Sequence, residues 1–360
     1  MTLTTSALLP PRIEPRTDPS ALTRSIKQTI CFYPYDYVLI VGQGRSGTNW
    51  LLQLLDLSPH THCRNEPNEI PDSPMSKLPN AWVSRSAMPA LDTNWDDAVR
   101  WTSHHMGERD QPLTSSKRHI HELSRKLQLH RLLKHRRLRS AIALLSPSLT
   151  HREWQLPWWL GRRRKLDEAL PVLKLLQVPG WAVWVLANRP NVLVVHIVRH
   201  PGGFLHSWRN RYLARHDPNE VAKANHERLR IVIDADPSWA GRFGDIGGMT
   251  ADESELWYWR YATETVHQAG IRSSAYQLVV YEDLVNHLDE HIIKLYAACG
   301  LPLDPAILIK ARDSAETSSH IANAWRHGAD GHALILLDRV ALKPDLQAWW
   351  QSSDVVHSPG

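Results

Sequence analysis

A glycine-rich loop between a strand-like run and a helix-like run constrains this chain more than any other feature. Residues 37–41 (YVLIV) are continuously apolar and rich in β-branched side chains, which predicts a parallel strand buried on both faces. Residues 42–50 (GQGRSGTNW) follow, and residues 48–57 predict a helix that ends before a Ser-Pro pair. Small residues let backbone N–H groups converge, and a helix N-terminus favours negative charge. The loop therefore predicts a site for a phosphate or sulfate group.

Two later segments show the same order of strand and helix. Residues 192–198 (VLVVHIV) predict a buried strand, and an amphipathic stretch follows it through Arg211. Residues 277–281 (QLVVY) predict a third strand, followed by one helix that ends at Cys299, where Gly300 suits the left-handed position after the last turn. Strands that alternate with helices predict an α/β fold, a parallel sheet flanked by helices on both faces.

The rest of the chain predicts three further parts. Residues 1–34 are rich in Pro, Ser and Thr and lack hydrophobic periodicity, so we expect a loosely ordered leader. The α/β domain is expected over residues 35–340. Within it, about residues 70–170 are expected to form a helical insert or cap that need not belong to the sheet. Residues 341–360 are expected to be a C-terminal tail.

Composition narrows the class of protein. A charged fraction of 22% and a hydrophobic fraction of 42% are ordinary for a soluble globular protein. No stretch approaches the roughly 18 consecutive apolar residues of a membrane span, and the N-terminus lacks a secretory signal, so we expect a cytoplasmic protein. The three cysteines are scattered, without the spacing of a disulfide framework or a metal site, and we expect no metal.

Positive charge is concentrated in one segment. Residues 117–165 hold 14 Lys and Arg against two acids, a net charge of +12, whereas the whole chain carries +5. Residues 118–145 place apolar side chains along one helical face and cations on the other. Such a basic amphipathic helix suits an anionic donor, an acidic acceptor, an anionic membrane surface or a solvated face of the cap. We expect no specific nucleic acid partner.

The glycine-rich loop fits two nucleotide-binding patterns incompletely. Gly42, Gly44 and Gly47 satisfy the dinucleotide pattern G-x-G-x-x-G. Glu66 lies near the position of a ribose-binding acid, but the segment before it (LDLSPHTHCRN) predicts a poor second strand. A Walker A loop would need a lysine immediately before Thr48, where this chain has a glycine. Hydrolysis of a nucleoside triphosphate is therefore disfavoured.

The loop also resembles the 5′-phosphosulfate-binding loop of the sulfotransferases that use 3′-phosphoadenosine 5′-phosphosulfate (PAPS) as donor. The similarity lies in residues 41–55 (VGQGRSGTNWLLQLL) and recurs in order along the chain. Residues 197–207 (IVRHPGGFLHS) resemble the family's 3′-phosphate site, residues 281–284 (YEDL) its Tyr-Glu-Asp-Leu segment, and residues 297–301 (AACGL) the end of its next helix. The resemblance implies a P-loop-type parallel sheet and PAPS as the donor, without a metal.

The resemblance also implies which residues bind the donor. Arg45 occupies the family's basic position and would contact the bridging oxygen and the leaving phosphate. Arg199 ends a buried strand and Ser207 lies two turns into the next helix, so the two can hold one phosphate. Taken alone, Arg199 could instead cap the sheet in an ion pair. The expected donor-binding residues are Arg45, Ser46, Gly47, Thr48, Asn49, Trp50, Arg199, Ser207, Tyr281 and Arg326.

Several residues are candidates for the general base. Lys174 stands where the family places a lysine that contacts the sulfuryl group, unless it is a solvated lysine, but the histidine that follows it in cytosolic sulfotransferases is missing. Residues 65–67 (NEP) resemble the segment that holds the glutamate base of tyrosylprotein and carbohydrate sulfotransferases, which makes Glu66 the candidate. The alternatives are Glu69, His60, His62, His104 and His105.

These residues together predict a sulfotransferase that moves a sulfuryl group from PAPS to an acceptor hydroxyl or amine by in-line displacement. Glu66, Arg45 and Lys174 are its expected catalytic residues. The acceptor class stays open among carbohydrate, small molecule, lipid and peptide. The alternatives are an NAD(P)-dependent oxidoreductase and a non-catalytic nucleotide-gated binding protein.

Overall fold

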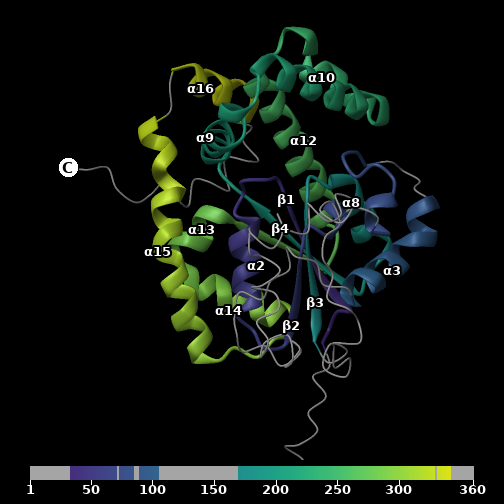
Figure 1. Cartoon of the computed structure of the whole chain (residues 1–360), viewed down its shortest axis with the longest axis vertical. Helices are drawn as coiled ribbons and strands as arrows, with labels where there is room; N and C mark the ends of the chain where they lie inside the picture. Colours follow the sequence, from purple (N-terminus) through teal and green to yellow (C-terminus); the bar gives the residue numbers. More distant parts are fainter. Residues whose placement is uncertain (1–32, 71–72, 85–88, 105–168, 329–330, 342–360) are drawn as a thin grey trace, which may run out of the picture. The chain divides into compact units, whose positions relative to one another are not determined.

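The structure of this chain is a computed structural model (Figure 1), and it describes residues 33–70, 73–84, 89–104, 169–328 and 331–341. The expected leader through residue 32, the segment with net charge +12 and the tail beyond residue 341 lie outside the described residues. Among the helices of the described ranges, none is long and apolar enough to cross a membrane.

Five parallel strands form one sheet in the order β2-β3-β1-β4-β5. They are β1 (Tyr37–Gly42), β2 (Thr61–Asn65), β3 (Leu170–Leu176), β4 (Val192–Val198) and β5 (Tyr276–Val280). The central strand β1 is paired on both sides, with Val38 opposite Val172 in β3 and Leu193 in β4. The parallel α/β fold expected from the sequence is confirmed.

Helices cover both faces of the sheet (Figure 1). Side chains alternate along β1, so Val38 and Ile40 pack with one group of helices and Leu39 and Val41 with the other. The first group is α2 (Thr48–Asp56), α13 (Tyr281–Asn286), α14 (Leu288–Ala298) and α15 (Pro305–Gly328). The second group is α3 (Pro89–His104), α8 (Pro179–Asn188) and α12 (Ala251–Gly270).

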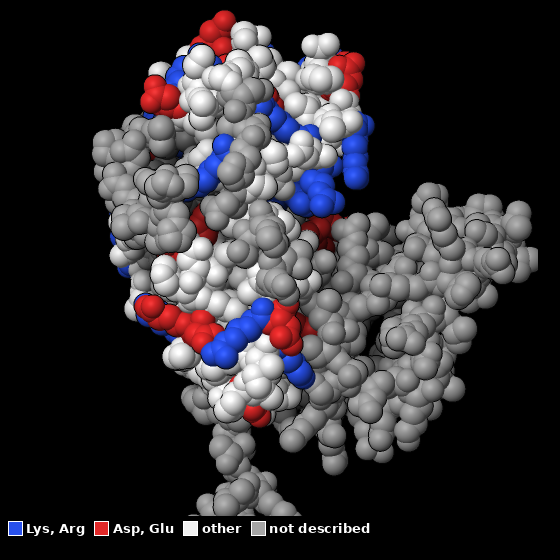
Figure 2. All heavy atoms as spheres, turned by 90° about the vertical axis from the view of Figure 1, so that its left-hand side faces the viewer, with Lys and Arg blue, Asp and Glu red and all other residues white. Residues whose placement is uncertain are grey.

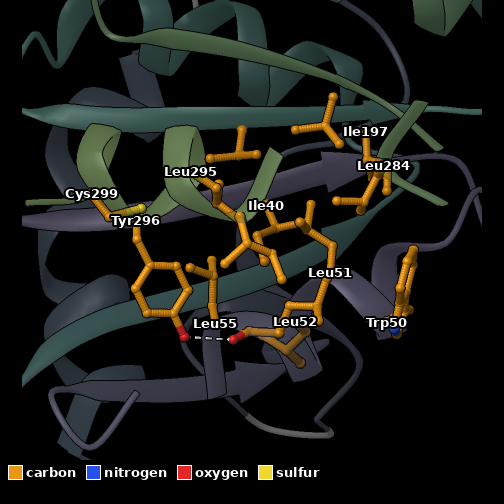
Figure 3. Close-up of a cluster of buried hydrophobic side chains, with 14 of the residues drawn as sticks. Ile40, Trp50, Leu51, Leu52, Leu55, Ile197, Leu284, Leu295, Tyr296 and Cys299 are labelled. Atoms are coloured by element: carbon orange, nitrogen blue, oxygen red, sulfur yellow. Dashed lines mark hydrogen bonds between the residues drawn. The ribbon is translucent and has the colours of Figure 1, made fainter. Parts of the chain in front are cut away.

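Helix α2 is held against the sheet by α14, and this contact fixes the end of the glycine-rich loop. Figure 3 shows Leu55 of α2 beside Tyr296 of α14, whose hydroxyl donates to the backbone oxygen of Leu54 at 2.8 Å. Leu51, Leu54 and Leu55 are at most 1% exposed. Burial of each leucine contributes roughly 1.5–3 kcal/mol. The first turn of α2 is therefore anchored by the core below it.

A second apolar cluster lies beyond Val198 and Val280, the last residues of β4 and β5. It is rich in aromatic side chains, and Trp239 meets Tyr261 edge to face at 5.1 Å. This cluster holds the helix that follows β4 in place.

The remaining helices are α9 (Pro201–Arg211), α10 (Pro218–Ala235), α11 (Ala240–Phe243) and α16 (Gly331–Leu336). The short helical turns are η1 (Pro67–Glu69), η2 (Met75–Lys77), η5 (Leu213–Arg215), η6 (Pro237–Trp239), η7 (Ile246–Gly248) and η8 (Leu337–Ala341).

Two strands lie where the sequence predicted none. The strand β2 lies before the expected insert of about residues 70–170, and β3 begins where that insert ends. The poor second strand of the sequence is β2, an edge strand that pairs with β3 alone. Its polar sequence (THCRN) lacks the apolar run by which the other strands are found. In β3, Lys174 interrupts such a run.

The chain after β5 also differs from its prediction. The single helix expected to end at Cys299 is two helices, α13 and α14, because the backbone leaves the helical region at His287 (φ −128°, ψ 48°). Tyr281 begins α13 instead of ending the strand. Gly300 has a φ of +66° and closes α14 as predicted, since its N–H donates to the backbone oxygen of Ala297 at 3.0 Å.

The strand order determines where a ligand can bind. The connection that leaves β1 runs toward one edge of the sheet, to β2. The connection that leaves β3 runs toward the opposite edge, to β4. Adjacent strands whose connections diverge in this way leave a crevice at their carboxyl ends. The glycine-rich loop follows β1 at this edge, and residues 174–177 end β3 there.

Candidate functional site

The loop between β1 and α2 leaves backbone N–H groups available to a ligand. Arg45 and Gly47 have φ values of +73° and +89°, and the Ser46 N–H donates to the backbone oxygen of Gln43 at 3.2 Å. No side chain caps α2, and its first turn carries no acid. The first N–H groups of the helix, from Thr48 onward, therefore keep the positive end of the helix open to an anion.

Aromatic side chains close one side of this loop. Tyr281, which is 4% exposed, lies so close to Gly47 that a Cβ atom there would be 2.3 Å from its ring. Trp50 meets the Tyr281 ring edge to face at 5.9 Å, and its Nε1 donates to Ser314 Oγ of α15 at 3.1 Å. Only glycine fits the loop at position 47, and the predicted residues Trp50 and Tyr281 lie together beside it.

Two predicted arginines meet at the same loop. Arg45 Nε donates to Ser207 Oγ of α9 at 3.1 Å. Arg199 Nη1 donates to the backbone oxygen of Arg45 at 3.0 Å, and its Nη2 donates to that of Ile321 in α15 at 2.8 Å. Burial lowers the pKa of Arg199, although arginine stays charged in proteins. The structure thus gathers Arg45 with Arg199 and Ser207, although the glycine-rich loop and the segment from β4 to α9 lie far apart in the sequence.

Arg211 belongs to this group of cations, and the sequence interpretation missed it. It follows Ser207 by four residues in α9, so the two side chains lie on one face of the helix. Burial lowers the pKa of Arg45, and the nearby charge of Arg211 lowers it further. Within the described ranges, Arg211 forms no ion pair. The spacing of four residues from Ser207 is the sequence signal that could have identified it.

A buried carboxylate, that of Glu282, lies beside Arg199. Glu282 accepts the backbone N–H of His200, the residue before α9, with both oxygens at 3.1 Å. Its Oε1 lies 3.9 Å from Arg199 Nε. Burial raises the pKa of Glu282 to about 7, against the opposing effects of the hydrogen bonds and of Arg199. This glutamate orients Arg199 and fixes the start of α9, a role that the sequence pattern alone did not indicate.

Lys174 joins the loop to the predicted base. Its side chain is fully buried, and Nζ donates to Glu66 Oε1 at 2.5 Å and to Asn49 Oδ1 in the first turn of α2. The backbone binds as well, since the Glu66 N–H donates to the oxygen of Lys174 at 2.9 Å. Lys174 is thus not a solvated lysine. It links a residue expected to hold the donor to the residue expected to take the acceptor's proton.

A cavity of about 260 Å³ adjoins this centre. Its wall includes Glu66, Glu69, Leu176 and Gln177. No histidine lies among the described residues of the cavity wall. His60 and His62, two of the alternative bases, lie before and within the first half of β2, whereas Glu66 follows the opposite end of that strand.

The remaining predicted residues lie farther from the centre or outside the described side chains. Arg326 is exposed on α15, with its guanidinium 5.2 Å from the ring centre of Trp325. Trp325 stacks on His200 at 4.3 Å, and His200 follows Arg199 in sequence. The side chain of His104 and the whole of His105 lie outside the described residues.

The arrangement can be compared with the chemistry of other nucleotide sites. Among the described residues, no group of three His, Cys, Asp or Glu side chains is placed to hold a metal ion. The dinucleotide alternative is not favoured, because β3 separates β1 from β2, whereas the dinucleotide fold places the second strand beside the first.

Comparison with known proteins gives one family. A model of the sulfotransferase family matches residues 37–305. Among solved structures, the sulfotransferase domain of an olefin synthase from Synechococcus is 15% identical, covers 85% of this chain and 94% of its own, and has a TM-score of 0.38. A Mycobacterium tuberculosis sulfotransferase is 16% identical (90% and 80% covered, TM-score 0.33). A mouse sulfotransferase complexed with PAP is 11% identical (88% and 82% covered, TM-score 0.35). No curated protein matches this chain.

Proposed function

This chain belongs to the sulfotransferase family, and from that premise we propose that it transfers a sulfuryl group from PAPS to an acceptor hydroxyl with Glu66 as the general base. The contact that carries the proposal is the one between Lys174 Nζ and Glu66 Oε1, at 2.5 Å, with Asn49 Oδ1 as the second partner of the same ammonium group. A single buried cation thereby connects the donor side of the site to the acceptor side.

The residues around the loop suit a donor with several anionic groups. The open N-terminus of α2 and the side chain of Arg45 would hold the 5′-phosphosulfate. The hydroxyl of Ser46 is buried and has no hydrogen-bond partner in the described part of the chain, which leaves it free to donate to a ligand oxygen. Ser207, Arg199 and Arg211 would hold the 3′-phosphate.

The residues also have the roles that an in-line displacement needs. The acceptor oxygen forms a bond to sulfur while the bond between sulfur and the bridging oxygen breaks, so adenosine 3′,5′-bisphosphate (PAP) leaves with that electron pair. The proton of the acceptor hydroxyl passes to the Glu66 carboxylate. Lys174 orients this carboxylate, and Arg45 balances the negative charge that grows on the leaving phosphate.

Nucleotide binding tests the donor assignment. Thermal unfolding is measured with PAP, NADP⁺ and ATP at equal concentrations. PAP is expected to raise the melting temperature most, because it is expected to have the lowest Kd of the three. A ligand at 100 times its Kd adds about 2.7 kcal/mol to the free energy of unfolding. Transfer of labelled sulfuryl from PAPS to a broad acceptor mixture then tests turnover. A larger shift with NADP⁺ than with PAP would contradict the assignment of the donor.

The substitution Glu66→Gln tests the base. It keeps the size of the side chain and the hydrogen bond to Lys174 but removes the proton acceptor, so turnover is expected to fall by ~10²–10⁴-fold. The Kd for PAP is expected to change by less than a few-fold, as measured by calorimetry. Glu227→Gln, on an exposed part of α10, is the matched control. Near-normal turnover in Glu66→Gln would transfer the role to Glu69 or to a histidine.

A further inference from the structure

The cavity beside Glu66 indicates which class of acceptor the site suits. Its volume is about 260 Å³, and Glu66 lies on its wall while also binding Lys174. A molecule in this cavity therefore reaches the carboxylate that receives the proton in the proposed reaction. This makes it the place where the acceptor hydroxyl is held.

The backbone around the cavity is held in an unfavourable conformation. Glu66 and Gln177, both on its wall, have φ values of +50° and +54°. In the described ranges, Arg45 of the donor loop is the one other non-glycine residue with a positive φ. Such residues persist where surrounding contacts impose them, which here are the hydrogen bonds from Glu66 N–H to Lys174 O (2.9 Å) and from Gln177 N–H to Gly42 O (3.2 Å). The fold maintains the shape of this wall at a cost to stability.

The polar groups of the wall are mostly hydrogen-bond acceptors. Glu69 is exposed, and its one side-chain partner among the described residues is Asn68, whose Nδ2 donates to Glu69 Oε1 at 3.0 Å. This bond fixes the orientation of the Asn68 amide, because a carboxylate can pair only with its nitrogen. The amide oxygen of Asn68 is then buried, with no hydrogen-bond partner in the described ranges. Glu69 lacks a cationic partner in the described ranges, whereas Glu66 has Lys174.

The second carboxylate lies next to the base. Glu66 and Glu69 flank one 3₁₀ turn, closed by the hydrogen bond from the Glu69 N–H to the Glu66 oxygen at 3.0 Å, and both line the cavity. Trp82, which is 40% exposed, contributes an indole surface to the same wall. The cavity thus combines Glu66, the exposed carboxylate of Glu69, which has no cationic partner among the described residues, and an apolar surface.

Resting on the proposed function, we propose that the acceptor is a compact hydroxyl compound that carries an ammonium group. An ammonium group has three N–H donors and no acceptor, which complements the exposed Glu69 carboxylate. The carbon skeleton packs on Trp82, and the hydroxyl faces Glu66. The sulfuryl group is transferred to this hydroxyl oxygen, its proton goes to Glu66, and the ammonium group is left unchanged.

Matched acceptors test the charge preference. Two series vary one group on a fixed skeleton: glucosamine, N-acetylglucosamine and glucuronic acid, and tyramine, N-acetyltyramine and 4-hydroxyphenylpropionate. Transfer from labelled PAPS gives kcat/KM for each compound. The amine is expected to exceed its acetamide by roughly tenfold or more, as for a hydrogen-bonded charged group, and the carboxylate is expected to be the poorest acceptor.

The substitution Glu69→Gln removes the proposed charge partner. It is expected to reduce the ratio between amine and acetamide to within about threefold, through a higher KM for the amine, with the Kd for PAP unchanged. The remote control Glu227→Gln is expected to keep the full ratio.

Each other outcome overturns the inference. It is wrong if the acetamide or carboxylate is the better acceptor, if the amine preference survives in Glu69→Gln, or if no compound of either series accepts the sulfuryl group. Binding of PAP separates this failure from that of the proposed function. If PAP binds while the acceptor test fails, only the acceptor class is wrong; if PAP does not bind, the proposed function itself fails.

Discussion

Arg199 and Arg211 both lie near Arg45 although like charges repel one another. In the described part of the chain, the nearest carboxylate to this group is Glu282, 3.9 Å from Arg199 Nε, and no acid pairs with Arg45 or Arg211. Such an accumulation of positive charge destabilises the protein until an anion binds. Because these charges are not balanced by acids, we count Arg211 among the candidate donor-binding residues, which sequence similarity did not indicate.

The substitution Arg211→Gln is expected to weaken PAP binding roughly tenfold, because a charge-assisted hydrogen bond to phosphate is lost. Binding of AMP, which lacks the 3′-phosphate, is expected to change little, and calorimetry of both nucleotides measures the difference. Arg215→Gln, an exposed arginine just after α9, is the control and should bind both nucleotides normally. Equal weakening of PAP and AMP would place Arg211 at the 5′ end of the donor.

Glu282 gives the protein a pH-dependent stability. Its pKa in the folded chain is about 7, above its ordinary value of 4.5, because burial disfavours the charged carboxylate. Between these two pH values the folded state keeps a proton that the unfolded state has lost, so this residue stabilises the fold at low pH and ceases to do so as the pH rises through 7.

The variant Glu282→Gln is expected to gain stability relative to the wild type as the pH rises from 5 to 8. The relative gain is on the order of 3 kcal/mol, because it accrues at about 1.4 kcal/mol per pH unit up to pH 7 and then levels off. Urea unfolding of both proteins at each pH measures it, and Glu227→Gln should follow the wild type. A constant difference between Glu282→Gln and the wild type across this range would show that Glu282 does not titrate there.

Among the elements, the loop before α2 requires glycine at position 47. A side chain at Gly47 must adopt a φ of +89° and would also overlap the Tyr281 ring. At Gly44, in the same loop, an added Cβ meets no atom within 4 Å. The two glycines of the G-x-G-x-x-G pattern thus have different structural roles, which the pattern itself does not reveal.

The pair Gly47→Ala and Gly44→Ala tests this difference. Gly47→Ala is expected to lower the free energy of unfolding by about 1–3 kcal/mol and to weaken PAP binding, because Tyr281 or the loop must move. Gly44→Ala is expected to stay within about 0.5 kcal/mol of the wild type. Thermal and urea unfolding measure the stability, and similar losses in both variants would exclude Tyr281 as the cause.

The charge of the whole molecule is distributed unevenly along the chain. Figure 2 shows positive and negative side chains interspersed over the described part of the face that carries α15. The segment of residues 117–165, with its net charge of +12, lies outside the described residues. Since we infer a cationic acceptor, this segment is unsuited to capture it. We propose an anionic membrane surface as its partner, with capture of the anionic donor and a solvated face of the cap as the alternatives.

Replacement of five cations of this segment tests that expectation. The variant changes Arg131, Lys134, Arg136, Arg137 and Arg139 to Gln. Sedimentation with liposomes containing phosphatidylserine is expected to show binding of the wild type that weakens with salt, since a Debye length of ~8 Å applies at physiological ionic strength. The variant is expected to lose this binding and to retain PAP affinity within a few-fold. Equal behaviour of the two proteins at every salt concentration would contradict a role in membrane capture.

The sequence alone predicts the anion loop, the strands β1, β4 and β5, and a set of candidate donor-binding residues. These features are local, because an apolar run, a glycine-rich turn and a capped helix depend on neighbouring residues. The tertiary structure decided which side chains meet. Lys174 lies 108 residues from Glu66 and 125 from Asn49, and Arg45 lies 162 from Ser207.

Only the tertiary structure reveals the strands β2 and β3 and the cavity between the base and Gln177. A polar edge strand carries no apolar run, and its place is set by hydrogen bonds to the neighbouring strand. A cavity likewise has no local signature, since its wall joins residues 66–69 to residues 176–178 and Trp82. Short segments of the sequence therefore predict the kind of donor. The proposed acceptor site, in contrast, depends on how the folded chain brings distant segments together.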